Sequence, residues 1–385
     1  MSQRYFLLFG CFFLVFVLHA QPGIPRYTNL NSGIGYIKVI DNTTDVSRIA
    51  TLKNQKSIRI AIALPEIPIE FKDFTHTESL HIETSADLSK LDLYFPNLKH
   101  LNIVRSNRKS IANKKFQFDS LRSLYIMRAK NLENMDAFSN CRTIEKLMLR
   151  GTPNLIHFPK FHRKNNIKEV IIDHGVTFRK KETANYLKNL KRLSKLENLT
   201  LANIYSLTEV PSYLPKSIQY LEINSWALHD HTTKIKSLKH LKKYTNLKFL
   251  KLYKIELAPI EDTFPEVSLA YLLLNTVYNL KDVSWIFTFQ HIDKVQLYDC
   301  YAYTTISVDR NSDVVSEIAI DKADSLTSIE SLFYLDNLKS LKVRHCPKLV
   351  VPSTDIMYKI PNLMMSGVGY RLYKSNGIWE QMEYD

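Results

Sequence analysis

The stretch NLKSLKVRHCPKLVVP, residues 337–352, contains the pattern that most of the chain repeats. Its apolar and small positions, spaced L-x-x-L-x-L and then three and six residues further on, are Leu338, Leu341, Val343, Cys346 and Leu349. A frame that recurs roughly every 20 to 29 residues is typical of a solenoid, in which each repeat packs only on its neighbours.

The second leucine of this frame serves as the marker of each repeat and recurs along the whole chain. Fifteen markers are found, at Ile37, Ile58, Leu80, Leu101, Leu124, Leu147, Val170, Leu199, Leu221, Leu250, Leu272, Val295, Ile318, Leu341 and Leu363. An apolar residue follows each marker by two positions, as Val343 follows Leu341. Alternation at period two predicts a short strand with one buried face in every repeat.

A second pair of apolar positions lies beyond the strand. A leucine follows the second strand position by six residues at Leu132, Leu155, Leu207, Leu280, Leu326 and Leu349. Three residues further on, an apolar side chain returns at Met135, Phe158, Val210, Val283 and Ile329. We expect this pair to turn the chain back beneath its own strand and to fill the closed coil.

These features resemble the leucine-rich repeat family over about residues 34–366. The resemblance implies an α/β solenoid, a horseshoe with a parallel concave β-sheet and short helical or irregular segments on its convex side. In the family, the position three after the last strand leucine is usually Asn, or else Cys or Thr, bonded to the turn. The family residue types occur at Asn42, Thr152, Cys300 and Cys346, whereas Trp226, Ile204, Ile255 and Val277 depart from them. The incomplete ladder indicates turns that are held by other contacts.

Residues 1–20 match a secretory signal peptide. Arg4 is followed by an apolar run over residues 5–18 and by Ala20, after which we expect cleavage. A membrane anchor is one alternative, but a run of about 14 apolar residues is shorter than the roughly 20 that span a bilayer. Lipid attachment at Cys11 is another. We expect a secreted, periplasmic or cell-surface protein with no transmembrane segment after cleavage.

The remaining domain organisation follows from where the repeats begin and end. Residues 21–33 are expected to cap the first coil, residues 34–366 to form the solenoid of about 15 repeats, and residues 367–385 to form a terminal cap. Asn376 and Gly377 stand between two alternating segments, which is a strong hairpin signal. The C-terminal cap is therefore predicted to be a hairpin.

Two marker spacings of 29 residues interrupt the period. Their extra residues, 181–196 and 233–244, predict amphipathic helices on the convex side. Both are basic on the polar face, through Lys180, Lys181, Lys188, Lys191, Arg192, Lys234, Lys236, Lys239, Lys242 and Lys243. This face is either simply solvated or docks on an anionic surface.

The net charge indicates which classes of partner to expect, and the cysteine count indicates whether disulfides form. The formal charge of +14 falls to +13 when Arg4 is lost, which favours acidic partners such as anionic polysaccharide or membrane surface; nucleic acid is not expected for a secreted chain. Cys141, Cys300 and Cys346 remain, an odd number without a C-x-x-C motif. We expect all three to be buried and unpaired.

Catalytic motifs are absent from the sequence. It has no G-x-S-x-G, no phosphate-binding glycine loop and no H-E-x-x-H. The segment from His229 to His231 is either a metal pair or an ordinary polar loop, and Asp173-His174 is interpreted as a turn. We therefore expect no catalytic residue, no metal and no cofactor. An enzyme of unrecognised type is the weakest of the alternatives.

The concave sheet is the expected binding surface. Side chains one before, one after and three after each marker point outward from the coil. The candidate partner-binding residues at such positions are Tyr220, Phe249, Lys251, Tyr253, Tyr271, Asn275, Tyr298, Lys342 and Arg344. The aromatic ones either form an interaction patch or only pack against one another. The resemblance implies a non-catalytic protein that binds a macromolecule, most readily another protein; carbohydrate, which can stack on tyrosine and phenylalanine, is the alternative.

Overall fold

The computed structural model describes residues 35–39, 46–155, 158–173, 186–225, 232–308, 313–350, 352–366, 371–375 and 378–383. The chain divides into two units, Met1–Ile34 and Gly35–Asp385. The first unit lies outside the described residues, and with it lie the signal-peptide, lipidation and N-terminal-cap predictions. The sheet, its coils and the candidate site all belong to the second unit.

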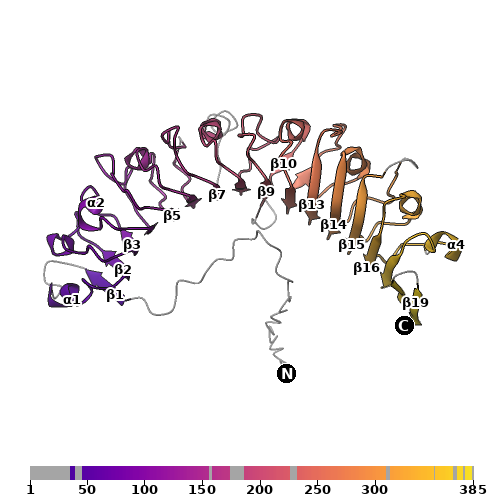
Figure 1. Cartoon of the computed structure of the whole chain (residues 1–385), viewed down its shortest axis with the longest axis horizontal. Coiled ribbons are helices and arrows are strands. Elements are labelled where there is room, and N and C mark those ends of the chain that lie inside the picture. Colours follow the sequence, from indigo (N-terminus) through magenta and orange to yellow (C-terminus); the bar gives the residue numbers. More distant parts are fainter. Residues whose placement is uncertain are drawn as a thin grey trace, which may run out of the picture. The chain divides into compact units, whose positions relative to one another are not determined.

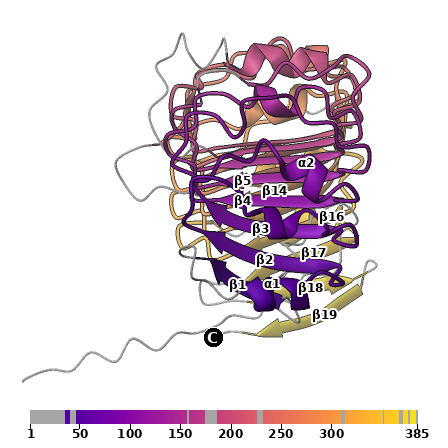
Figure 2. The same cartoon turned by 90° about the vertical axis from the view of Figure 1, so that its left-hand side faces the viewer.

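Fifteen strands of this unit pair in parallel in chain order and line its inner side (Figure 1). They are β1 Gly35–Val39, β2 Ser57–Ile62, β3 Ser79–Thr84, β4 His100–Val104, β5 Ser123–Met127, β6 Lys146–Arg150, β7 Glu169–Asp173, β8 Asn198–Ala202, β9 Tyr220–Asn224, β11 Phe249–Tyr253, β13 Ser268–Asn275, β14 His291–Tyr298, β15 Val315–Asp321, β16 Ser340–Arg344 and β17 Asn362–Ser366. Seen from one end, successive strands lie one above another in a single layer (Figure 2). The predicted parallel sheet with one strand per repeat is confirmed.

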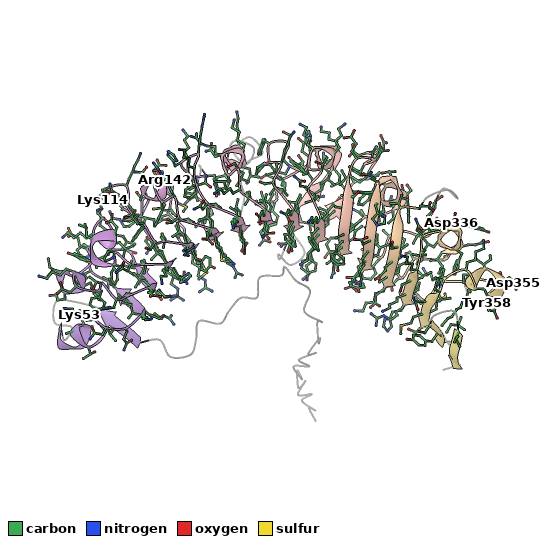
Figure 3. The ribbon with its side chains drawn as sticks, viewed as in Figure 1. Lys53, Lys114, Arg142, Asp336, Asp355 and Tyr358 are labelled. Atoms are coloured by element: carbon green, nitrogen blue, oxygen red, sulfur yellow. The ribbon has the colours of Figure 1, made fainter. Side chains whose placement is uncertain are left out.

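Short helices and turns make the return path on the outer side (Figure 1). The α-helices are α1 Val46–Thr51, α2 Leu91–Tyr94 and α4 Thr354–Met357. The 3-10 helices are η1 Ile69–Phe71, η2 Asp136–Phe138, η3 Lys188–Arg192, η4 Lys239–Lys243, η5 Ser284–Thr288 and η6 Glu330–Tyr334. Charged side chains such as Lys114, Arg142 and Asp336 extend from this outer side (Figure 3).

The markers from Ile58 to Leu363 pair directly with one another across neighbouring strands. The first marker is wrong by two residues, because Ile37 pairs with Ile60 and Gly35 pairs with Ile58. Glycine has no apolar side chain, so the hydrophobic pattern placed the marker at the next apolar residue expected to point inward, Ile37. The shift is even, and the expected faces of β1 therefore stay the same.

The inside of each coil is filled as the second apolar pair predicts. Leu132, Leu155, Leu207, Leu280, Leu326 and Leu349 are buried, and so are Met135, Phe158, Val210, Val283 and Ile329. Together with the strand residues they form one continuous core along the unit. A residue at these positions contributes chiefly through burial of apolar surface, about 25 cal/mol per Å².

The turns after the strands are held by backbone contacts in place of an asparagine ladder. Nine of the residues two positions after the last strand leucine have a left-handed backbone: Arg105, Arg128, Gly151, Asn203, Lys254, Thr276, Asp299, Lys322 and His345. Each donates its N–H to a carbonyl of the following repeat, for example Lys322 to Arg344 at 3.0 Å. This conformation costs an L-residue about 1–2 kcal/mol, and the repeated inter-repeat bonds offset that cost.

The second predicted amphipathic helix, residues 233–244, is wrong in type and length, because the structure has there the two-residue strand β10, Lys234–Ile235, followed by η4. Within the first, residues 186–187 are helical and are followed directly by η3. β10 pairs with β12, Glu256–Leu257, of the next repeat. Burial of Ile235, Leu238 and Leu241 satisfies the apolar spacing without a long helix, because three-residue steps suit a 3-10 turn as well. Residues 181–185 lie outside the described part.

At the C-terminal end the strand pairing changes from parallel to antiparallel. β18, Arg371–Ser375, pairs antiparallel with β17 and with β19, Ile378–Glu383. The two strands flank the Asn376-Gly377 pair, as expected for the predicted hairpin. The boundaries assigned to the signal peptide and the caps stay predictions.

Candidate functional site

The nine candidate binding residues lie on the sheet in three aligned rows. Tyr220, Phe249 and Tyr271 are direct neighbours in one row. Tyr253 and Asn275 are neighbours in another, which continues to Tyr298. Six of the nine are on β9, β11 and β13, and the other three, Tyr298, Lys342 and Arg344, lie further along the sheet on β14 and β16. The nine residues therefore occupy equivalent outward positions of the sheet, whereas their role in binding stays a prediction.

The aromatic row is half-buried, and its residues contact one another. The rings of Tyr220 and Phe249 have centroids 6.3 Å apart and are tilted by 38°. The Tyr271 hydroxyl donates a hydrogen bond to Oε1 of Gln296 on β14. Burial raises the pKa of the Tyr271 hydroxyl above its ordinary value, which keeps it a donor at neutral pH. Both alternatives expected for these aromatics thus hold in part, because the row packs against its neighbours while each residue keeps some exposed surface.

A buried carboxylate, Glu222, joins this row to the next. Its side chain is 8% exposed. The Tyr220 hydroxyl donates to Oε2 at 2.5 Å, Asn224 Nδ2 donates to Oε1 at 2.6 Å, and Lys251 Nζ lies 3.3 Å from Oε1. Burial, and then the Glu222 charge, raise the pKa of Tyr220. Glu222 was not among the residues expected from the sequence, although its place directly after the marker Leu221 and opposite Lys251 was visible in the frame.

Lys251 and Lys254 complete the aromatic region. Their ammonium groups lie 5.8 and 5.2 Å from the centroid of the Tyr253 ring, within the range of cation–π attraction. Asn275 accepts a hydrogen bond from the Thr276 hydroxyl at 2.8 Å. The polar groups of this region are therefore largely satisfied by each other.

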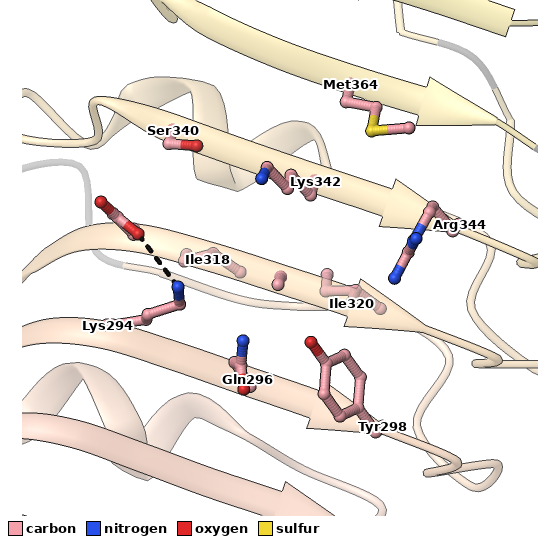
Figure 4. A pocket seen from close by; sticks show the side chains of 11 residues that line it. Lys294, Gln296, Tyr298, Ile318, Ile320, Ser340, Lys342, Arg344 and Met364 are labelled. Carbon is pink, nitrogen blue, oxygen red and sulfur yellow. Dashed lines mark ion pairs between the residues drawn. The ribbon is translucent and has the colours of Figure 1, made fainter. Parts of the chain in front are cut away.

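A hollow of about 170 Å³ opens on the same sheet surface over β14, β15 and β16 (Figure 4). Its floor is at Ala319, whose register neighbours are Gln296 and Lys342. The surrounding side chains include Tyr298 and Arg344. The hollow exists because alanine occupies a position at which the adjacent strands carry long polar side chains.

Charge in and beside the hollow is almost balanced. Lys294 pairs with Glu317 at 3.5 Å, as the dashed line in Figure 4 shows, and Arg344 pairs with Asp321 at 3.1 Å. Lys342 is exposed and forms no ion pair with a residue that the structure describes. One positive charge among these five is therefore left without a carboxylate.

The sequence candidates for metal and thiol chemistry lie only partly among the described residues. Within the described ranges no cluster of three His, Cys, Asp or Glu residues could hold a metal, and His229–His231 lie outside them. Asp173 ends β7, where it pairs with Arg150 at 3.1 Å and accepts from Asn203 at 2.7 Å. The cysteines are buried and free, as predicted, and burial raises the pKa of Cys141 and Cys300 to about 12.

The outer basic segments are partly neutralised. Lys234 pairs with Glu256 at 2.8 Å, and Lys239 pairs with Glu209 at 3.1 Å. Lys188, Lys191, Lys236, Lys242 and Lys243 are exposed and have no ion pair within the described chain. A search of that same part for a helix long and apolar enough to cross a membrane finds none.

Comparison with known proteins finds similar solved structures but no matching sequence. No protein-family model matches the chain, and neither does any curated protein. Among solved structures, an internalin from Listeria monocytogenes is similar over 84% of this chain and 82% of its own, with 14% identity and a TM-score of 0.41. A TLR13–ssRNA13 complex is similar over 81% of this chain and 53% of its own, with 13% identity and a TM-score of 0.40.

The fold itself rests on the chain's own geometry. One strand per repeat, direct register between successive markers and a closed apolar coil occur together from β2 to β17. Such repeats bury their apolar faces only by stacking on neighbours. In its fold, the described part from β2 to β17 is a leucine-rich repeat solenoid.

Proposed function

We propose that this protein is a non-catalytic binding protein that is secreted or held at the cell surface and recognises another protein on its concave sheet. The observation that carries the proposal is the row Tyr220, Phe249 and Tyr271. These residues lie side by side and each precedes a buried marker, Leu221, Leu250 or Leu272, on strands that line the inner side (Figure 1). Contiguous, partly exposed aromatic surface marks interaction sites, and aromatic residues dominate binding hot spots.

The mutual packing of the row supports this function as well. Rings held by Glu222, Gln296 and each other lose little conformational freedom when a partner arrives. Part of each ring still faces solvent, because all three residues are only half-buried. The row therefore offers rigid apolar area at a low entropic cost. Secretion is supported by the apolar leader of residues 5–18 alone.

Affinity capture from the extracellular fluid of the producing organism tests the proposal. The full chain is the bait, beside Phe249→Ser and a matched control, Tyr278→Ser, which removes a 45% exposed aromatic after β13. We expect capture of one dominant protein, lost about tenfold or more with Phe249→Ser, as for a hot-spot residue, and unchanged with Tyr278→Ser. Equal capture by both variants would contradict the role of the row.

Carbohydrate is the rival ligand of the same row. A glycan array separates the two ligands: strong binding to one sugar class, lost in Tyr271→Ala, would replace the protein partner. No described aromatic ring of the row lies fully open as a stacking platform, since each is half-buried. The geometry therefore favours the protein partner.

An anionic polymer is a second candidate ligand, on the outer side. The five exposed lysines without ion pairs in and beside η3 and η4 favour it. Retention on heparin should fall when Lys188, Lys191 and Arg192 are made neutral, and a triple neutral variant at Lys53, Lys72 and Lys109 is the control. Unchanged elution of the first variant would exclude the outer site.

A further inference from the structure

The hollow over Ala319 differs from the aromatic row because several hydrogen-bond donors in its lining have no acceptor within the described chain. Gln296 accepts the Tyr271 hydroxyl at Oε1, so its Nε2 is the atom left to face the hollow, as Figure 4 shows. The amide is thereby presented as a donor. An amide held in this way distinguishes an acceptor ligand from a donor ligand.

Three further groups around the hollow are donors, and the one carboxylate of its lining, Glu317, is paired with Lys294. The Tyr298 hydroxyl extends toward β15 and forms no hydrogen bond with a described residue (Figure 4). Burial raises its pKa, so it keeps its proton at neutral pH. Arg344 carries N–H groups beyond the one that binds Asp321, and Lys342 has three N–H groups without a described acceptor. Four donor groups from β14 and β16 therefore line the hollow over Ala319.

Charge points to the same ligand. Glu317 and Asp321 are each matched by a cation, and Lys342 is the remaining positive charge. An anion with one charge and two acceptor oxygens satisfies both the donors and the charge balance. Size limits the ligand further, because the hollow holds about 170 Å³ and is bounded by the long side chains on the two strands beside Ala319.

We propose that this hollow is a carboxylate-binding subsite that takes the side chain of an aspartate or glutamate from a protein partner lying across β14–β16. The inference rests on the proposed protein-binding function and adds its chemistry: the partner is acidic where it crosses Ala319. Lys342 and Arg344 supply the charge, Gln296 and Tyr298 supply directed hydrogen bonds, and Tyr271 acts as a positioning residue because it fixes the amide of Gln296.

A methyl NMR titration of the full chain tests the subsite without knowledge of the partner. The reporter is the Ala319 methyl group, and the probes are the peptides acetyl-Gly-Glu-Gly-amide and acetyl-Gly-Gln-Gly-amide at millimolar concentration. We expect the glutamyl peptide to shift this signal and to bind about fivefold or more tightly than the glutaminyl peptide, as a charge-assisted contact would. Equal binding of the two peptides, or no shift, overturns the proposal.

Variants locate the effect. Ala319→Leu fills the hollow and should abolish binding; because this variant lacks the Ala319 reporter, its binding is followed at the methyl group of Met364, which also lines the hollow. Lys342→Met should weaken binding about fivefold. Lys348→Met removes an exposed lysine in the turn after β16 and should leave binding unchanged. Tyr271→Phe frees the Gln296 amide to rotate and should reduce the preference for glutamate over glutamine about twofold or more. Binding that survives Ala319→Leu in a folded protein overturns the proposal.

A third probe identifies the source of the carboxylate. Methyl β-glucuronide presents the same group on a sugar, and tighter binding of this probe than of the glutamyl peptide would overturn the choice of a protein ligand. The two proposals fail separately. Equal partner capture by Phe249→Ser and Tyr278→Ser, together with glutamate-selective peptide binding, rejects the aromatic row alone. Loss of capture in Phe249→Ser, together with no peptide binding, rejects the subsite alone.

Discussion

The aromatic row on β9–β13 and the hollow on β14–β16 lie on the same sheet but use their polar groups in opposite ways. Around Glu222, the Tyr220 hydroxyl, the Asn224 amide and the Lys251 ammonium group all bind the same carboxylate. Around Ala319, donors from Tyr298 and Lys342 have no acceptor in the described chain. The difference shows that residue type alone does not identify a binding position: a group already bonded within the protein stiffens the surface, and an unused one recognises a ligand.

The largest expected effect tests whether the two regions share one core. Leu272→Ala beneath the aromatic row and Leu341→Ala beneath the hollow each remove a fully buried marker side chain. We expect each to lower the free energy of unfolding by about 2–5 kcal/mol, the usual range for such cavities, as measured by urea denaturation. A much smaller loss at Leu341 would mean that the hollow reaches into the core.

The next effect compares the two carboxylates. Glu222→Gln should cost about 1–2 kcal/mol of stability, because it leaves Lys251 without a counter-charge and sets a donor beside the Asn224 or Tyr220 donors. Glu317→Gln, the matched change at a 50% exposed carboxylate with one ion pair, should stay within about 0.5 kcal/mol. Equal losses would refute the distinction between the regions.

Alkaline pH provides a weaker test of the same contrast. Burial raises the pKa of Tyr220 and of Tyr298 above the unfolded value near 10. The folded state therefore keeps both hydroxyls neutral at a pH at which the unfolded state ionises them. Their stabilising contribution is complete below about pH 10 and is lost as the pH rises above it, by at most about 1.4 kcal/mol per pH unit for each group. We expect Tyr220→Phe to reduce the fall in unfolding free energy between pH 10 and pH 12 more than Tyr298→Phe does, because Tyr220 also faces the Glu222 charge. Urea denaturation at each pH measures this fall. The reverse order would contradict the assignment.

The smallest effect concerns the turns that follow the two regions. Thr276 after β13 and Lys322 after β15 both have a left-handed backbone. Glycine adopts this conformation without strain, but it also makes the unfolded chain more flexible. We expect Thr276→Gly to raise the unfolding free energy by up to about 1 kcal/mol and Lys322→Gly by about half of that, since branching at Cβ adds strain. A loss of stability at both positions would mean that their side-chain contacts dominate.

Some features of the site were predictable from the sequence, and others were not. The neighbours Tyr220, Phe249 and Tyr271 followed from the marker frame, because equal offsets in successive repeats become direct neighbours in a parallel sheet. Glu222 and Gln296 were missed, because a polar residue at an outward position looks ordinary until its partners are known. The hollow was missed for a related reason: an alanine in the sequence does not reveal the long side chains that surround it.

The sequence by itself determined the strands, their register from β2 onward and the inward face of every coil. A slip of one residue would expose each buried leucine, so the alternation of apolar residues leaves little freedom. The tertiary structure decided the short 3-10 segments in place of helices, the hydrogen bonds that replace the asparagine ladder, and the division between satisfied and unused donors. These depend on backbone groups and side chains from adjacent repeats, more than twenty residues away in the chain, and become defined only when the repeats stack.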